Sequence, residues 1–158
     1  MVLSALLAAC AVSEQTKAEK TARKELLAQQ VREGVENRHF TIDVRVAHPL
    51  RGRTVQLTSP YDLSVRGDTI ISYLPYFGRA YFVPYGGGKG LNFEGQITAY
   101  EVKQGSKGKY VVNMMVQNDE DEYFYFVTLF DNGSASVDVS SRNRDRISFS
   151  GSFNPDGK

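Results

Sequence analysis

The sequence predicts an α+β protein, in which one N-terminal helix precedes a curled or barrel-like antiparallel β-sheet of about nine or ten short strands. Three observations lead to this fold class. Apolar residues follow a helical spacing up to residue 36 and alternate with polar residues from residue 40 onward. Turn-forming residues then recur at hairpin spacing toward the C-terminus. Nine Tyr and nine Phe, in a chain without Trp, also favour strands.

The helix is predicted over residues 17–36, because strong helix formers fill nearly all of this segment. Thr16 and Glu19 fit a capping box, with Thr16 as the N-cap. An apolar stripe is clearest in the second half, where the residues that recur every four positions are Leu27, Val31 and Val35. We therefore expect residues 11–38 to form a polar tether and an amphipathic helix.

The strands are predicted from a period of two that begins with Phe40, Ile42, Val44 and Val46. The expected segments are 40–46, 55–57, 61–65, 70–76, 79–85, 91–103, 110–117, 123–130, 135–139 and 147–153. Asn132-Gly133 is the strongest turn signal between two of them. Flat open sheets of this width are unusual, so the sheet should curl strongly or close.

These strands are expected to form one β domain over residues 39–153, followed by a short tail at residues 154–158. A chain of 158 residues can bury a core large enough for a single domain. The residues we expect in that core include Phe40, Val44, Val127 and Leu129.

Cys10, the single cysteine, is predicted to carry a lipid anchor. Residues 2–9 are uncharged and mostly apolar, and Leu7-Ala8-Ala9-Cys10 has the form of a lipobox. Small residues there let a signal peptidase hold an extended backbone, after which the thiol is diacylated and binds a membrane stably. A helix start that happens to hold a cysteine is the alternative interpretation.

Residues 1–10 are therefore interpreted as the end of a lipoprotein signal. This signal looks truncated, because no Lys or Arg precedes its short apolar run. Eight apolar residues are too few to span a bilayer. Ala11 rather than Asp after the cysteine favours the outer membrane, so we expect a lipid-anchored envelope protein that faces the periplasm.

The sequence predicts no catalytic residue, no metal site and no cofactor. Nineteen basic and eighteen acidic residues give a net charge of +1, which argues against nucleic acid as a partner. The run Gly86-Gly87-Gly88-Lys89-Gly90 lacks the Ser or Thr that follows the lysine of a phosphate loop. His39 and His48 have no third histidine or nearby thiolate to complete a metal site.

One group of aromatic residues stands above this background. Tyr73, Tyr76, Tyr81 and Tyr85 surround Arg79, and a tyrosine offers an apolar ring with a polar tip. These five residues are the candidate ligand-binding site. The structural alternative, which we favour, is that they pack in the core or across strands, with Pro75 and Gly78 shaping a bend.

The run Tyr73-Leu74-Pro75-Tyr76-Phe77-Gly78-Arg79-Ala80-Tyr81 is distinctive. With Tyr61-Asp62-Leu63-Ser64-Val65, Gly67-Asp68 and Asn132-Gly133 around it, the sequence resembles the domain-of-unknown-function family 4251, small exported lipoproteins of Gram-negative bacteria. The match extends over about residues 38–153. The resemblance implies an exported protein, which agrees with a lipid on Cys10, and it implies no activity.

We therefore expect a non-enzymatic envelope lipoprotein that binds a small or extended ligand at its Tyr/Phe surface. The alternative is a structural or assembly partner at the outer membrane, which binds another envelope protein through a sheet edge or the helix. A hydrolase is a third class. An empty cavity beside the tyrosines would favour the first, and a filled interior with an exposed apolar patch would favour the second.

Overall fold

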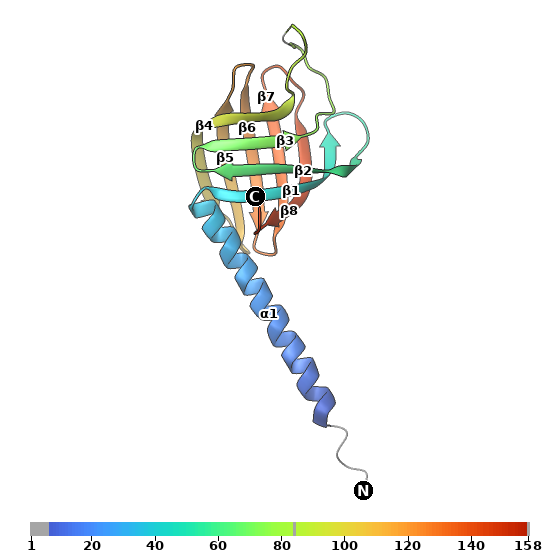
Figure 1. The fold of residues 1–158 in the computed structure, drawn as a ribbon, viewed down its shortest axis with the longest axis vertical. Helices are drawn as coiled ribbons and strands as arrows, with labels where there is room; N and C mark the ends of the chain where they lie inside the picture. Colours follow the sequence, from blue (N-terminus) through green and yellow to red (C-terminus); the bar gives the residue numbers. More distant parts are fainter. Residues whose placement is uncertain (1–6, 84, 158) are drawn as a thin grey trace.

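A computed structural model describes residues 7–83 and 85–157, with the backbone alone for residues 7–13. The described residues form one helix and eight strands (Figure 1). The helix is α1 (Leu7–Glu36). The strands are β1 (His39–Pro49), β2 (Val55–Arg66), β3 (Thr69–Leu74), β4 (Leu91–Gln104), β5 (Lys109–Gln117), β6 (Glu122–Phe130), β7 (Ser134–Ser141) and β8 (Ile147–Asn154). The predicted α+β fold is confirmed.

The sheet closes into a barrel, because each strand pairs antiparallel with the next and β8 pairs with β1. This up-and-down order places the connections alternately at two ends. The helix end carries α1 and the β2–β3, β4–β5 and β6–β7 turns. The loop end carries the β1–β2, β3–β4, β5–β6 and β7–β8 connections. Closure leaves a free edge only on parts of strands, such as residues 98–104 of β4, which pair with β5 and have no partner in β3.

Apolar side chains from every strand fill the inside of the barrel. The predicted burial of Phe40, Val44, Val127 and Leu129 is confirmed. A buried tyrosine also lies there, and its hydroxyl is satisfied: Tyr125 Oη donates to Ser72 Oγ at 3.1 Å. Eight-stranded barrels are wide enough either to fill with side chains or to hold one small ligand, and this one packs side chains.

A β-bulge in β1 changes which side chains face the core. The register with β2 and with β8 shifts between Val44 and Val46. After the shift Ala47 is buried, whereas Val46, which simple alternation placed inside, is half-buried. Gly151 of β8 faces the bulge, and a Cβ there would overlap the carbonyl oxygen of Asp43. Glycine therefore allows the two strands to approach and close the barrel.

Two differences account for eight strands rather than nine or ten. Residues 55–57 and 61–65, expected as separate strands, are both parts of β2, which continues through Pro60. The paired register omits residues 57–60 on its β1 side, where a proline can be tolerated. Residues 79–85, expected as a strand, lie in the β3–β4 loop, where Ala80 makes a single isolated bridge to Arg144.

The second half of α1 covers the helix end. Val31 and Val35 are buried in the core, and Leu27 packs against it, which confirms the predicted stripe. Gly34 lets the helix approach closely, since a Cβ there would lie 3.0 Å from the carbonyl oxygen of His39. Tyr100 of β4 donates its hydroxyl to the Val35 carbonyl at 2.8 Å, at the C-terminus of the helix.

The first half of α1 projects away from the barrel into solvent (Figure 1), and residues 14–26 are exposed. The predicted N-cap at Thr16 is wrong, because α1 begins at Leu7 and continues through Thr16. No Gly or Pro lies between residues 7 and 16, so nothing there ends a helix.

The predicted signal lies partly in residues 1–6, outside the described residues. Cys10 lies in α1, outside the part whose side chains are described. The described part of the chain holds no helix long and apolar enough to cross a bilayer.

Stability is expected to fall above about pH 10 through Tyr100. Burial raises the pKa of Tyr100 to about 12, against a smaller opposite effect of Arg38. The folded state therefore holds this proton more tightly than the unfolded chain does. The stability that this raised pKa contributes is complete below about pH 10 and is lost as the pH rises toward 12. Urea unfolding of Tyr100→Phe across this range should show a shallower decline than the parent chain. Equal declines would contradict the assignment.

Candidate functional site

The aromatic segment that stands out in the sequence lies mainly in the loop between β3 and β4, residues 75–90. This loop protrudes at the end of the barrel opposite α1 (Figure 1). Its backbone is attached to the β7–β8 turn. The Tyr81 amide donates to the Asn143 carbonyl at 2.7 Å, and the Asp145 amide donates to the Arg79 carbonyl at 2.9 Å. The loop is thus part of the fold at both of these points.

Tyr76 holds the loop in place through hydrogen bonds of its side chain. Its half-buried hydroxyl lies 2.8 Å from the Arg79 carbonyl oxygen and 3.0 Å from that of Asp145, and it donates to them. Burial, and next the carboxylate of Asp145, raise the pKa of Tyr76, so the phenol is a neutral donor. Gly78 leaves room for this ring, because a Cβ there would lie 2.7 Å from the Tyr76 hydroxyl. Tyr76 therefore has a structural role, as the alternative interpretation expected.

A buried ion pair lies beneath Tyr76. The Arg144 side chain is 8% exposed and the Glu120 side chain 11%, with Nη2 and Oε2 at 3.7 Å. The Arg144 guanidinium also lies under the Tyr76 ring, 5.6 Å from its centroid. Glu120 in turn accepts hydrogen bonds from the Lys89 amide at 3.1 and 3.2 Å. The pair thus joins the loop to the β5–β6 and β7–β8 turns.

The side chain of Tyr81 is held by its hydroxyl group. Its hydroxyl donates to Asp145 Oδ1 at 2.7 Å, while 68% of the residue stays exposed. This hydrogen bond lowers the pKa of Asp145 and raises the pKa of Tyr81. The ring is therefore oriented, but most of its apolar surface faces water.

The five predicted ligand-binding residues do not share one face. Tyr76, Arg79 and Tyr81 gather around Asp145, and the Arg79 side chain is exposed. Tyr73 lies on the outer wall at β3, where its ring centroid is 5.3 Å from that of Tyr61. Tyr85 is fully exposed on the loop. The period of this segment suggested a strand, so these separate positions could not be predicted.

The loop exposes more apolar surface than its tyrosines alone suggest. Its exposed large apolar residues are Phe77, Tyr81, Phe82, Val83 and Tyr85. Residue 84, which stands between Val83 and Tyr85 in the chain, lies outside the described part. Isolated exposed apolar residues are ordinary, but a run of them on one loop is typical of an interaction surface.

Other chemistry considered in the sequence meets no supporting arrangement. Lys89, in the glycine run, forms an ion pair with Asp119 at 3.4 Å. His48 Nε2 hydrogen-bonds with Ser150 Oγ at 2.9 Å, which gives it a structural partner. Across the described residues, no group of three or more His, Cys, Asp or Glu side chains is placed to hold a metal ion.

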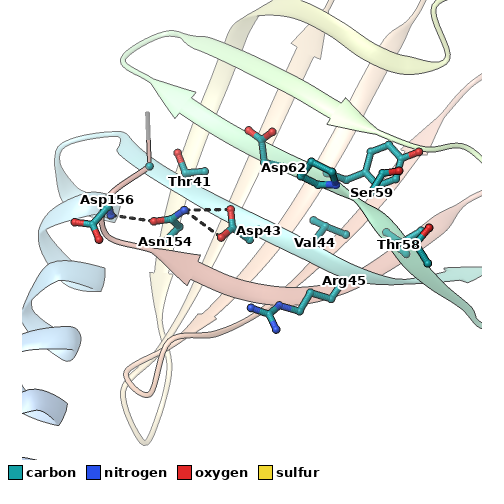
Figure 2. A pocket seen from close by; sticks show the side chains of 13 residues that line it. Thr41, Asp43, Val44, Arg45, Thr58, Ser59, Asp62, Asn154 and Asp156 are labelled. Atoms are coloured by element: carbon teal, nitrogen blue, oxygen red, sulfur yellow. Dashed lines mark hydrogen bonds between the residues drawn. The ribbon is translucent and has the colours of Figure 1, made fainter.

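A groove of about 790 Å³ on the outer wall was not predicted. It lies over β1, β2 and the end of the chain (Figure 2). Asp43 and Asp62, directly opposite each other across β1 and β2, both line it. Asn154 Nδ2 donates to both Asp43 oxygens, at 3.2 and 3.0 Å. The groove can accept hydrogen bonds from a donor-rich molecule. The bulge decides which residues face each other here, so sequence alternation could not reveal it.

Comparisons with known proteins identify the family of this chain. A family model described as "Domain of unknown function (DUF4251)" matches residues 22–153. The chain belongs to the DUF4251 family. A crystal structure of a DUF4251 family protein from Bacteroides eggerthii is similar, with a TM-score of 0.65 and 17% identity over 85% of this chain and 91% of that one. At this identity the likeness concerns the DUF4251 fold alone. A search of curated proteins found no match.

Proposed function

We propose that this DUF4251 protein is a non-enzymatic binding protein of the cell envelope, held by a lipid on Cys10, and that its β3–β4 loop contacts another component of the envelope. The observation that carries the proposal is the run of exposed apolar side chains, Phe77, Tyr81, Phe82, Val83 and Tyr85. Hydrogen bonds and a buried ion pair support the loop behind them. An exposed apolar surface whose residues are held in place by supporting contacts is typical of a binding site.

The filled interior supports surface binding rather than ligand storage. Side chains from all eight strands occupy the space that an eight-stranded barrel could give to a small ligand. Closure of the barrel also leaves only short stretches of strand edge for a partner to extend, such as residues 98–104 of β4. The exposed loop is then the surface best suited to a partner.

The position of Cys10 supports the anchoring part of the proposal. From Cys10 to Glu36 the chain is helical, which corresponds to about 40 Å of helix. The projecting half of this helix is polar and exposed. A lipid on Cys10 would therefore hold the barrel away from the bilayer and leave the loop end free.

Cys10→Ser is expected to move the protein from the membrane fraction to the soluble fraction, because a serine cannot be acylated by the thioether route. The measurement is fractionation of cells that express the natural reading frame, with intact mass spectrometry of the N-terminus. Ser13→Ala is the matched control and should stay in the membrane fraction. An unmodified N-terminus in the parent chain would contradict lipidation.

Site-specific photocrosslinking tests the loop. Phe82→p-benzoylphenylalanine should give a discrete adduct in cells, because Phe82 is exposed on the loop. The control is the same replacement at Phe126, which is 43% exposed on the wall at β6. Adducts of equal yield at both positions, or none at Phe82, would contradict binding through the loop.

A further inference from the structure

Three segments meet around Asp145 at the loop end. Pro49 of β1 pairs with Ile147 of β8, so the β1–β2 turn lies beside the β7–β8 turn. The loop joins them through the Asp145 amide and the Arg79 carbonyl. The Tyr81 hydrogen bond is the largest cause of the lowered pKa of Asp145, and burial opposes it. Arg51 and Arg79 lower this pKa further, which agrees with both residues lying near Asp145.

The exposed large apolar side chains of the loop and of the β1–β2 turn are called the loop-end patch. Its members are Leu50, Phe77, Tyr81, Phe82, Val83 and Tyr85, all more than a third exposed. Five of them come from the loop, which protrudes from the barrel (Figure 1), and one comes from the β1–β2 turn. Exposed aromatic side chains can insert into the headgroup region of a membrane.

The basic residues near this patch divide into paired and unpaired groups. Four are paired with carboxylates, in the pairs Lys89–Asp119, Arg142–Glu122, Arg144–Glu120 and Arg146–Asp138. Arg51, Arg53 and Arg79 are exposed, and the described residues offer them no ion pair within 4.0 Å. Asp145 and Asp121 also lie at this end and accept hydrogen bonds from Tyr81 and from backbone amides. These neutral donors leave both carboxylates charged, so the three arginines outnumber the two carboxylates that have no ion pair among the described residues.

We infer that the loop-end patch docks on an anionic lipid surface, with its aromatic side chains in the interface and Arg51, Arg53 and Arg79 facing the phosphate groups. This inference rests on the proposed function and names its partner. Tyrosine and phenylalanine suit the boundary between headgroups and acyl chains. A guanidinium binds phosphate oxygens in a bidentate manner, so three unpaired arginines complement an anionic surface. Because Cys10 and the patch lie toward opposite ends of the molecule (Figure 1), an anchored protein would present the patch to a surface facing its own membrane.

Vesicle co-sedimentation tests this inference with the unlipidated full chain, Cys10→Ser. Binding to vesicles of phosphatidylcholine with phosphatidylglycerol should be at least about tenfold tighter than to phosphatidylcholine alone, and it should weaken with salt. Arg79→Gln should reduce binding to the anionic vesicles by about fivefold. Phe82→Ser should reduce it by about tenfold or more.

Phe126→Ser is the matched control, since it removes an exposed ring from the barrel wall, and it should leave binding unchanged. All three variants alter exposed side chains, and unchanged melting temperatures would verify that they fold. No binding, equal binding to both vesicles, or binding unaffected by Arg79→Gln and Phe82→Ser would overturn the inference. If a protein adduct still forms at Phe82, the proposed function stands with a protein partner. If neither vesicles nor adducts are found, both proposals fall.

Discussion

Phe149→Ala is expected to lower the free energy of unfolding by about 3–5 kcal/mol. The Phe149 side chain is fully buried. Phe149 lies opposite Ala47 of β1 and Val137 of β7 in the sheet register, where the pairing of β8 with β1 closes the barrel. Truncation removes apolar contacts and leaves a cavity, which the surrounding strands cannot fill without breaking their hydrogen bonds.

Urea unfolding at neutral pH measures this effect. The control is Phe126→Ala, which removes the same ring from the outer wall of β6 and should cost less than about 1 kcal/mol. Equal losses in the two variants would show that the inside of the barrel is not the main source of stability.

Arg144→Ala should also lower the free energy of unfolding by about 3–5 kcal/mol, because it leaves the largely buried carboxylate of Glu120 without its cation. It removes the cation beneath the Tyr76 ring as well, so the loop loses part of its support. Unfolding in urea gives the free energy, and limited proteolysis gives the exposure of residues 75–90. Both the stability and the protection of the loop should decrease.

Arg142→Ala serves as the control for Arg144→Ala. Arg142 also pairs with a carboxylate, Glu122 at 3.0 Å, but its side chain is 74% exposed, so its loss should cost less than about 1 kcal/mol. The double variant Arg144→Met with Glu120→Leu should recover part of the lost stability, since no buried charge is left unpaired. A loss in Arg144→Ala no greater than in Arg142→Ala would show that the ion pair does not hold the loop.

The sequence singled out the segment but not its arrangement. The density of tyrosines around Arg79 pointed to residues 73–85, and the structure brings Tyr76, Arg79 and Tyr81 to one residue, Asp145, of which only Tyr81 contacts the carboxylate. Asp145 lies 69 positions from Tyr76 in the chain, and neither it nor the Arg144–Glu120 pair has a local signal. Which tyrosine supports the loop and which exposes its ring depends on these distant partners.

The sequence by itself determined the local elements. The stripe of Leu27, Val31 and Val35 predicted the packed half of α1. Alternation predicted β7, and flanking turn residues predicted β5, both close to their observed bounds. These properties follow from periods of 3.6 and 2.0 residues, which depend on near neighbours in the chain.

The tertiary structure alone decided closure and register. The bulge after Val44 exchanged Val46 for Ala47 in the core, and the register of β1 with β2 brought Asp43 opposite Asp62. Residues 79–81 joined the β7–β8 turn instead of a strand. The pairing of β1 with β8 closed the barrel across most of the chain. Such pairings depend on which distant backbone groups can satisfy each other once the core is packed, and a local pattern holds no information about that choice.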